Sequence, residues 1–371
     1  MRGTVLITGG AGFIGSHLAS ELLRAGYRVR VLDSLIPQVH GARPDRPAYL
    51  HKDAELVVGD VRNPEMVDKA LAGVDAVYHF VALVGVGQSM YQIADYTSIN
   101  NLGTAVLLER VVKHRVSKLI VASSMSVYGE GRYLTEKGDP YDHATRSTTQ
   151  LKSRDWEMTM PDGSALRPVP TPEHKQPSLA SVYALSKYDQ EQMCLMVGRA
   201  YGVPTVAMRF FNAYGPYQSL SNPYTGVLAI FASRLMNGQR PIIFEDGQQL
   251  RDFVSVYDVA RACRLALEVD AARDLVFNVG SGQTISVRDV ASSLAKVLGK
   301  KIEPEVTGNY RVGDIRHCFP DINLARSVLG YKPSMTLEKG MRDLAAWLDQ
   351  QTAHDRFNEM RAELTARGLV V

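Results

Sequence analysis

The chain has 371 residues and a mass of 40.9 kDa, with 45% apolar and 22% charged residues. This length predicts two domains, or one large domain with a smaller lobe, and the apolar fraction excludes wholesale disorder. The 42 lysines and arginines exceed the 39 aspartates and glutamates by three, and no long run of one sign occurs. That balance argues against a dedicated nucleic-acid-binding protein.

The cysteine pattern and the hydropathy pattern point to an intracellular protein. Cys194, Cys263 and Cys318 are too widely spaced for a disulfide framework or a CxxC metal site. An apolar strand begins within a few residues of Met1, which leaves no room for a signal peptide. No apolar run reaches the roughly 18 residues that a membrane span requires. We therefore expect a soluble cytoplasmic protein that has no membrane partner.

Strand patterns and helix patterns alternate along the first 210 residues. The predicted strands cover residues 4–8, 28–32, 56–58, 76–80, 118–122 and 205–209, and the main predicted helices cover about 14–23, 64–71, 98–114 and 181–201. This alternation is typical of a doubly wound, parallel α/β sheet of the Rossmann type. We predict a dinucleotide-binding domain over 1–210 plus about 252–277. A smaller substrate-binding lobe is predicted over about 211–251 and 278–371.

A polar, proline-containing stretch at about 130–176 interrupts this alternation. We interpret it as an insert in the first domain, because it shows no sustained period. It contains His143 and His174 but no cysteine, which argues against a zinc site, and we predict no metal. Three roles remain open for the insert: a lid over a binding pocket, a dimer-contact flap, or a passive surface loop.

A glycine-rich loop joins the first predicted strand to the first helix. Gly10, Gly12 and Gly15 have the GxGxxG spacing, in the strand–turn–helix context that makes the motif specific for a dinucleotide. Glycine lets the backbone approach a pyrophosphate, which the helix amino terminus stabilises. Asp33 ends the second strand, where a carboxylate binds ribose hydroxyls and repels a 2′-phosphate, so we expect NAD rather than NADP. Asp60 follows the third strand and is either an adenine contact or an ordinary turn aspartate.

A tyrosine and a lysine open the helix at 181–201. Tyr183 and Lys187 are four residues apart and therefore share one helix face. A free tyrosine has a pKa of about 10, and a neighbouring ammonium favours its phenolate, so the pair can act as a base. A YxxxK pair alone is weak support for this role. Together with the glycine loop and with Ser124 at the end of a predicted strand, the pair indicates a catalytic site.

With these motifs, the chain resembles the extended short-chain dehydrogenase/reductase family, and within it the nucleotide-sugar 4-epimerases. The resemblance covers nearly the whole chain. It rests on the segments 8–15, 59–61, 100–104, 183–187, 209–216, 251–253 and 311–314. It implies that Tyr183 is the general base and acid at the sugar hydroxyl, that Lys187 binds the nicotinamide ribose, and that Ser124 binds the reacting oxygen.

The resemblance also implies two sets of binding residues. The expected NAD contacts are Gly9, Gly12, Phe13, Ile14, Gly15, Asp33, Asp60, Val61, Phe80, Ala82, Asn100, Tyr183, Lys187 and Phe211. The expected contacts to the nucleoside diphosphate sugar are Ser124, Ser126, Asn212, Val227, Arg251, Arg311 and Cys318. Guanidinium groups suit the pyrophosphate because they donate paired, charge-assisted hydrogen bonds.

The expected reaction begins with oxidation of the sugar at C4, which gives a 4-keto sugar. Family members that then eliminate water carry an acidic pair where this chain has Met125 and Ser126. Neither side chain can act as a carboxylic acid, so the resemblance implies an epimerase that returns the hydride to the other face of C4. The alternatives are a dehydratase or reductase of the same fold and, more remotely, a non-catalytic NAD-sensing protein.

The sequence leaves the identity of the substrate open and supports the oligomeric state only through the family resemblance. Cys318 either leaves room for an N-acetyl group or is simply a small packed residue. The insert and the run at 221–227 resemble the dTDP-L-rhamnose 4-epimerase branch, while UDP-glucose, UDP-galactose and their N-acetyl forms stay open. The family resemblance implies a homodimer formed by the helices at about 98–114 and 183–200, whose apolar residues are Leu107, Leu108, Val111, Met193, Leu195 and Met196.

Overall fold

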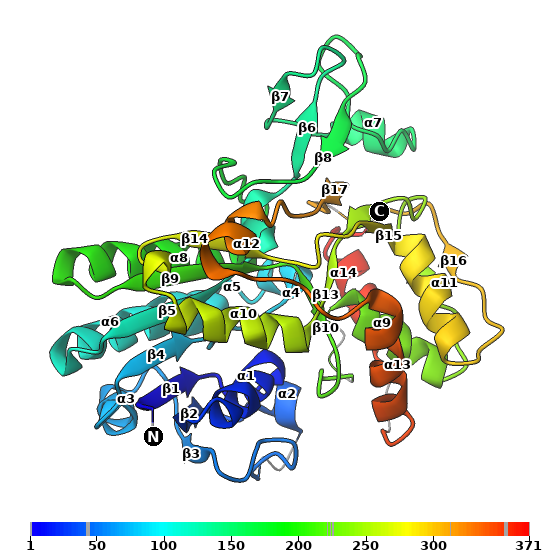
Figure 1. The fold of residues 1–371 in the computed structure, drawn as a ribbon. Helices are drawn as coiled ribbons and strands as arrows, with labels where there is room; N and C mark the ends of the chain where they lie inside the picture. The colour runs from blue at the N-terminus through cyan, green and yellow to red at the C-terminus, as the bar shows by residue number, and fades with distance from the viewer. Residues whose placement is uncertain are drawn as a thin grey trace.

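The structure is a computed structural model that describes residues 2–41, 45–220, 222, 224, 226–311, 313–351 and 355–370. Its centre is a seven-stranded parallel sheet (Figure 1). The strands are β1 (Thr4–Thr8), β2 (Arg28–Asp33), β3 (Glu55–Val58), β4 (Ala76–His79), β5 (Lys118–Ser124), β9 (Thr205–Phe210) and β14 (Val276–Val279). Their order across the sheet is β14-β9-β5-β4-β1-β2-β3, which confirms the predicted Rossmann fold.

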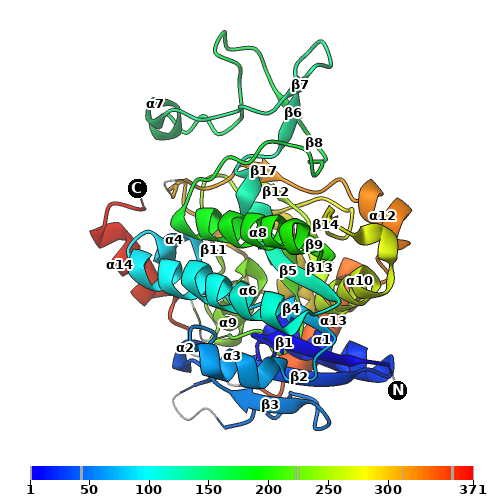
Figure 2. The ribbon, with the colours of Figure 1, turned by 90° about the vertical axis from the view of Figure 1, so that its left-hand side faces the viewer.

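Helices cover both faces of this sheet. The main ones are α1 (Phe13–Arg24), α3 (Pro64–Leu71), α6 (Gly103–His114), α8 (Val182–Tyr201), α10 (Val256–Glu268) and α12 (Asn323–Leu329). One face packs on α1, α10 and α12, and the other on α3, α6 and α8, so the alternate residues of each buried strand enter two separate apolar cores. Figure 2 shows α6 and α8 side by side on the outside of the molecule.

The smaller lobe is built from short strands and three main helices. Its elements are β10 (Asn212–Tyr214), α9 (Val227–Met236), β11 (Ile242–Ile243), β12 (Leu250–Arg251), β13 (Phe253–Ser255), β15 (Ile285–Ser286), α11 (Val287–Val297), β16 (Glu305–Val306), β17 (His317–Cys318) and α13 (Leu337–Leu348). The helices α9, α11 and α13 enclose a third apolar core. Helix α12 lies in the predicted smaller lobe but packs with the central sheet.

The insert at 130–176 forms a small antiparallel unit that projects above the sheet (Figure 2). It contains β6 (Arg132–Leu134), β7 (Pro140–Tyr141), α7 (Thr148–Lys152) and β8 (Arg167–Val169), with β6 between the other two strands. Tyr133, Ala144, Met158 and Leu166 form its own buried cluster. The absence of a long period in the sequence is therefore explained by very short elements.

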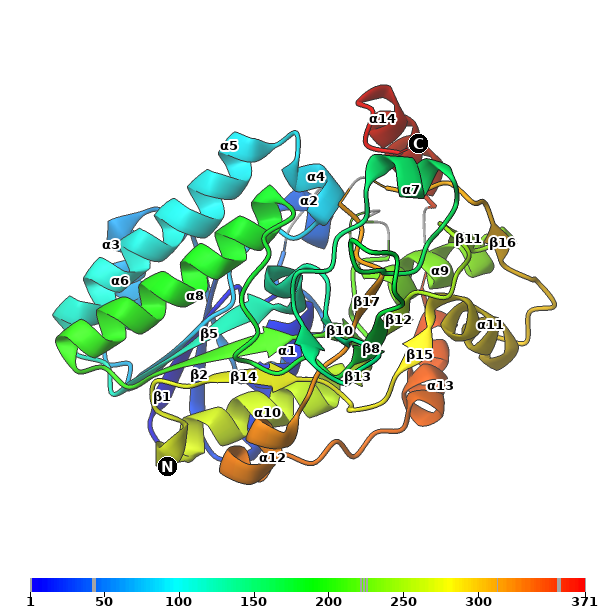
Figure 3. The ribbon, with the colours of Figure 1, turned by 90° about the horizontal axis from the view of Figure 1, so that it is seen from above.

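Most of the remaining elements lie at the carboxyl ends of the strands, and the turn between α10 and β14 lies at their amino ends. They are α2 (Pro37–His40), α4 (Val86–Ser89), α5 (Ile93–Tyr96), the π-helical turn η1 (Thr97–Leu102), the 3₁₀ turns η2 (Met125–Tyr128) and η3 (Asp270–Ala272), and α14 (Phe357–Ala366). The expected helix at 98–114 is thus a π-helical turn that continues into α6. Figure 3 shows α14 beside α4, at the edge of the sheet where ligands bind in folds of this type.

Candidate active site

A cleft of about 710 Å³ lies along the carboxyl ends of the central strands. One wall comes from the loops after β1, β2, β4 and β5, and the other comes from the smaller lobe and α14. Within the first wall, β1 and β4 are neighbours in the sheet, although β2 and β3 and their helices separate these two strands in sequence. A reversal of strand order of this kind opens a crevice at which doubly wound sheets bind their ligands.

The glycine loop has the shape that a pyrophosphate requires. Gly9 has a φ of +71°, and a Cβ on Gly15 would lie only 2.5 Å from the Cα of Gly10. Helix α1 begins at Phe13 without a side-chain cap and without an acidic residue in its first turn. Its first N–H groups and the positive end of its dipole therefore face the cleft as an anion site.

The Asp33 carboxylate binds two backbone N–H groups and also lines the cleft. One carboxylate oxygen accepts the backbone N–H of Ala11 at 3.0 Å, and the other accepts the N–H of Leu35 at 2.9 Å. The carboxylate thus connects the end of β2 to the glycine loop and also lines the cleft. This placement fits the expected contact with ribose hydroxyls, and the loop as a whole fits a dinucleotide.

Ser124 and Tyr183 meet at the centre of the cleft. Ser124 ends β5, and its Oγ accepts the backbone N–H of Ser126. The hydroxyl oxygens of Ser124 and Ser126 lie 3.1 Å apart. Tyr183 lies in the first turn of α8, where its N–H donates to Ser89 Oγ at 3.0 Å. Burial raises the pKa of Tyr183, and its hydrogen bond with Ser124 opposes that rise. Without further positive charge, the phenol is therefore protonated at neutral pH.

Lys187 lies one turn further along α8 and belongs to a buried hydrogen-bond network. Its Nζ donates to Gln190 Oε1 at 2.7 Å, and burial lowers the pKa of Lys187 to about 8. The amide nitrogen of Gln190 contacts His79 Nε2, Thr104 Oγ1 and the carbonyl oxygen of Val81 at 2.9–3.1 Å. These partners lie on β4, on the loop after it and on α6. The glutamine therefore joins the lysine to the sheet.

His79 and Gln190 were not predicted from the sequence. Burial lowers the pKa of His79 to about 3, so the ring is neutral, and its Nδ1 lies 2.8 Å from Thr8 Oγ1. Gln190 is the third residue after Lys187, a spacing that puts both on one helix face. That spacing was the available signal, but a glutamine in a helix is usually solvent-exposed.

A buried ion pair supports α8 from behind. Arg209 on β9 donates to both carboxylate oxygens of Glu191 at 2.9 and 2.7 Å, and Ser123 Oγ donates to the same carboxylate at 2.6 Å. Both charged side chains are almost fully buried. The pair fixes α8 against β5 and β9, and with it the helix turn that carries Tyr183 and Lys187.

The other end of the cleft carries the two expected pyrophosphate arginines. Arg311 pairs with Asp314 at 2.8 Å and lies 4.9 Å from the centre of the Phe244 ring. Arg251 donates to the backbone carbonyls of Leu250, Ile315 and Arg316 instead of to a carboxylate. Both guanidinium groups are held in place, and both residues line the cleft, as do the expected Ser126, Asn212 and Val227.

Comparison with known proteins identifies the family. The sequence model of the NAD-dependent epimerase/dehydratase family matches residues 5–151 and 161–280. The chain belongs to this family. The dTDP-L-rhamnose 4-epimerase of Burkholderia thailandensis is 38% identical over 355 residues, which cover 94% of this chain and 95% of that protein.

Solved structures agree with this assignment. The UDP-glucose 4-epimerase of Thermotoga maritima, solved with UDP-glucose, has a TM-score of 0.76 and 30% identity and covers 94% of this chain and 99% of its own. The UDP-glucose 4-epimerase of Thermus thermophilus, solved with NAD, has a TM-score of 0.74 and 29% identity and covers 94% of this chain and 100% of its own. The expected NAD-dependent nucleotide-sugar 4-epimerase is therefore confirmed as the class of this enzyme.

Most of the expected binding residues of this epimerase line the cleft, but two do not. The expected NAD contacts found in its lining are Gly9, Gly12, Phe13, Ile14, Gly15, Asp33, Asp60, Val61, Phe80, Ala82, Tyr183, Lys187 and Phe211. Asn100 is fully buried behind it, where its side chain binds the backbone of Leu83 and the hydroxyl of Ser186. Asn100 therefore supports the cleft wall and does not itself line the space for NAD.

Cys318, expected to contact the sugar, does not line the cleft. Its thiol is fully buried in a cluster with Met125, Tyr128 and Phe211, outside the lining of the cleft. Burial raises the pKa of the Cys318 thiol to about 12, so it is a neutral, packed group. The interpretation of Cys318 as a small packed residue thus fits the structure, and the proposed space for an N-acetyl group at this position does not.

The insert does not cover the cleft. Every residue from 130 to 176 is described, and none of them lines the cleft, so the structure does not support the lid interpretation. The insert is instead joined to the smaller lobe, where Arg146 pairs with Glu245 at 2.8 Å and donates to the carbonyl of Asp314 at 3.1 Å. Arg316 pairs with Glu157 of the insert at 2.5 Å.

The acidic residues in the lining of the cleft are Asp33, Asp60 and Asp314. Asp33 ends β2, Asp60 follows β3, and Asp314 is paired with Arg311. Asp60 also pairs with Arg62. Within the described residues, no group of three or more histidines, cysteines or acidic residues could hold a metal ion. Among the same residues, no helix is long and apolar enough to cross a membrane.

Proposed function

We propose that this epimerase inverts C4 of the sugar in dTDP-L-rhamnose. The observation that carries the proposal is the 38% identity to the dTDP-L-rhamnose 4-epimerase of Burkholderia thailandensis, which extends along nearly the full length of both chains. UDP-glucose 4-epimerases, such as the one from the mouse, are 30% identical over a similar share of this chain. The run at 221–227 also resembles the rhamnose branch, although Ser221, Pro223 and Thr225 lie outside the described residues.

The chemistry of the cleft wall beside Tyr183 supports a 6-deoxy sugar. Val84, Val86 and Met90 line the cleft here, and all three side chains are exposed in it. They belong to or flank α4, whose Ser89 accepts the backbone N–H of Tyr183. Apolar groups favour the methyl group of a 6-deoxy sugar, whereas a C6 hydroxyl would lose water without gaining a hydrogen bond.

The geometry of the cleft supports the catalytic roles that the family resemblance implies. Bound NAD supplies a reversible hydride acceptor at the sugar C4. Tyr183, as a phenolate, accepts the proton of the C4 hydroxyl, while Ser124 donates a hydrogen bond to the same oxygen. The Lys187 ammonium and the positive nicotinamide stabilise that phenolate, so the pKa of Tyr183 is lower in the loaded enzyme than in the chain alone. After the keto sugar turns, Tyr183 returns the proton to the C4 oxygen.

The remaining side chains hold the substrate and restrict the outcome. Arg251 and Arg311, with Asn212, bind the pyrophosphate, and Arg311 can exchange its partner Asp314 for phosphate oxygens. Because the positions next to Ser124 carry Met125 and Ser126, no carboxylic acid assists departure of a group from the sugar. The keto sugar would therefore be reduced again by the cofactor, which the glycine loop and Asp33 would hold beside it. In this proposal the sheet domain binds NAD and the smaller lobe binds the nucleotide sugar.

We also propose that the enzyme is a homodimer formed by α6 and α8. Of the apolar residues expected there, Leu107, Leu108, Val111 and Leu195 are buried within the subunit. The exposed apolar residues on this face are Ile93, Leu102, Leu185 and Met196. A second copy of the same face would cover them. Light scattering should give twice the chain mass, and a Leu102→Asp variant should give the mass of one chain.

Product analysis by NMR tests the proposed activity. Purified protein, without added cofactor, is incubated in parallel with dTDP-L-rhamnose, UDP-glucose and UDP-N-acetylglucosamine. The coupling constants of H4 report the configuration at C4. We expect the C4 epimer of dTDP-L-rhamnose, with the same final mixture from either epimer. Turnover of a UDP-sugar alone would contradict the proposed substrate, and a 4-keto-6-deoxy product would contradict the proposed reaction.

A further inference from the structure

The carboxy-terminal segment 355–370, which we name the strap, forms part of the cleft. It consists of α14 and the residues around it. The strap residues in the lining are Phe357, Met360, Leu364 and Leu369, all apolar. They pack with Ile242 and Phe244 of the smaller lobe. The cleft wall opposite the glycine loop is thus partly made by the last helix of the chain.

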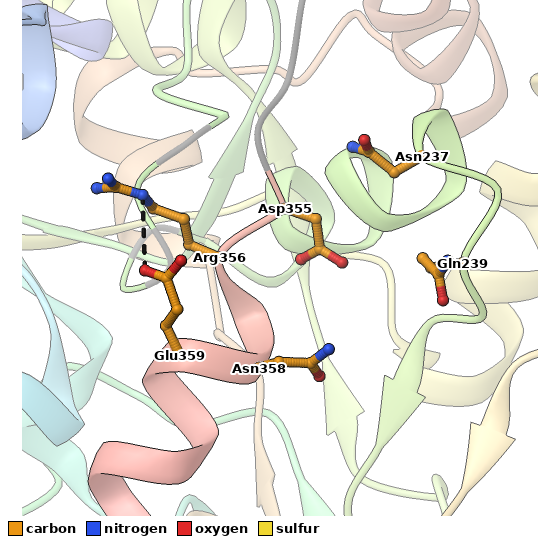
Figure 4. Close-up of a pocket in the computed structure, with 6 residues that line it drawn as sticks. All are labelled: Asn237, Gln239, Asp355, Arg356, Asn358 and Glu359. Carbon is orange, nitrogen blue, oxygen red and sulfur yellow. Dashed lines mark ion pairs between the residues drawn. The ribbon is translucent and has the colours of Figure 1, made fainter.

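The start of the strap is fixed to α9. Arg234, almost fully buried, donates to Asp355 at 3.0 Å, and its guanidinium lies 4.9 Å from the centre of the Phe357 ring. Figure 4 shows this junction, where polar side chains that follow α9 and others at the start of α14 lie around Asp355, and where Arg356 pairs with Glu359. The polar side of α14 therefore faces solvent, and its apolar side faces the cleft.

The middle of the strap contacts the segment that follows β4. Glu363 accepts hydrogen bonds from Tyr91 at 3.1 Å and from Tyr224 at 3.0 Å. A Cβ on Gly87 would lie 3.2 Å from the side chain of Leu364. Gly87 belongs to α4, whose Ser89 binds the backbone of Tyr183. The strap is therefore in contact with the apolar wall that we assign to the sugar.

The end of the strap is joined to Arg311. Val370 and Arg311 form an isolated antiparallel β-bridge. The Arg311 guanidinium lies over the ring of Phe244, and Phe244 packs in the same cluster as Met360 and Leu364. Both the backbone and the side chain of this arginine are thus held by the strap or by residues packed on it.

We infer that the strap is part of the nucleotide-sugar site: its apolar face borders the bound nucleoside diphosphate sugar, and its end positions Arg311 for the pyrophosphate. This inference rests on the proposed role of Arg311. The strap contacts neither the glycine loop nor Lys187 through any described hydrogen bond, so its loss should weaken substrate binding and leave NAD in place. It is a positioning segment and carries out no chemical step.

Four proteins test the inference: the full chain, a chain that ends at Gln351, a Leu364→Ala variant and a Glu359→Ala variant. Glu359 is on the solvent side of α14, which makes it the matched control. We measure the NAD content, the affinity for dTDP by calorimetry, and kcat and KM. For the shortened chain we expect about tenfold weaker dTDP binding and a similarly raised KM, with NAD retained and kcat within about twofold. Leu364→Ala should show a smaller loss in the same direction, and Glu359→Ala should show none.

The role of Arg311 is tested in a double-mutant cycle. Shortening the chain in an Arg311→Ala background should cost less dTDP affinity than shortening it in the full enzyme, because the arginine is already absent. Equal affinity of the full, shortened and Leu364→Ala proteins, measured with both dTDP and UDP, overturns the inference. A full chain that binds UDP but not dTDP contradicts the proposed rhamnose substrate instead. Since dTDP binding is measured directly, a failure of the proposed rhamnose substrate would be seen separately, as absent turnover by a full chain that binds dTDP.

Discussion

Two regions of this epimerase hold their functional residues by different means. Behind Tyr183, the network around Lys187 consists of neutral groups, because Gln190 and the neutral ring of His79 satisfy one another. At the junction of the insert and the smaller lobe, by contrast, the contacts are ionic. There the fully buried Arg316 meets Glu157, Glu245 and Asp246 at 2.5–3.0 Å.

The neutral network and the ionic junction suit different tasks. A neutral network leaves the Lys187 ammonium as the dominant local charge, so its field acts on Tyr183 and on the cofactor. The ionic junction joins segments that are distant in sequence and holds Arg316, whose backbone carbonyl, like that of Ile315, accepts a hydrogen bond from Arg251. Burying such charges is costly unless every one of them is paired, so the junction is stable only as a complete set.

The largest expected effect is at the reacting atoms. A Tyr183→Phe variant keeps the ring that packs at 6.4 Å from Tyr96 but lacks the hydroxyl that accepts the proton. Turnover should fall about a thousandfold, the range of general-base catalysis, while the NAD content of the purified protein stays the same. Normal turnover by this variant would show that another group is the base.

An Arg316→Met variant breaks the ionic region. It leaves three carboxylates facing one another without their shared partner, so the free energy of unfolding should fall by about 3–5 kcal/mol. Urea denaturation measures this loss. The control is Arg342→Ala, which removes an exposed pair with Glu338 and should cost less than about 1 kcal/mol. A similar small loss in both variants would mean that the junction is not a cooperative unit.

Two substitutions of Gln190 test whether the neutral network holds Lys187. Gln190→Leu removes the acceptor of the buried ammonium, so the pKa of Lys187 should fall below about 8, by about one unit. Activity that needs the charged lysine would then be lost at lower pH than in the wild type. Gln190→Glu supplies a negative partner and should move the same alkaline limb upward. The pH profile of kcat/KM measures both, and equal limbs in all three proteins would exclude a role for Gln190 in holding Lys187.

The sheet and the dinucleotide loop were predictable because their signals are local. Each strand from β1 to β9 in the central sheet is a short apolar run, and the glycine spacing with Asp33 places the loop without any knowledge of distant residues. The predicted helix at 64–71 has the same bounds as α3. The predicted strand at 118–122 is two residues shorter than β5, which continues to Ser124.

The substrate side was less predictable because its contacts are distant in sequence. Arg146 and Glu245 are 99 residues apart, and Arg316 and Glu157 are 159 apart, so no local pattern pairs them. Cys318 was placed by its distance from Arg311 along the chain, which does not tell on which side of β17 the thiol points. The strap has an ordinary amphipathic sequence, and only its contacts show that its apolar face meets the cleft.

The order of the elements along the chain also has a consequence for biosynthesis. The last strand of the central sheet, β14, ends at Val279, whereas Arg311 and the strap lie in roughly the last sixth of the chain. Because a ribosome makes the chain from its amino end, the strands of the NAD-binding half are complete while those later residues are still unmade. We therefore expect a nascent chain to acquire its cofactor site before it can recognise a sugar.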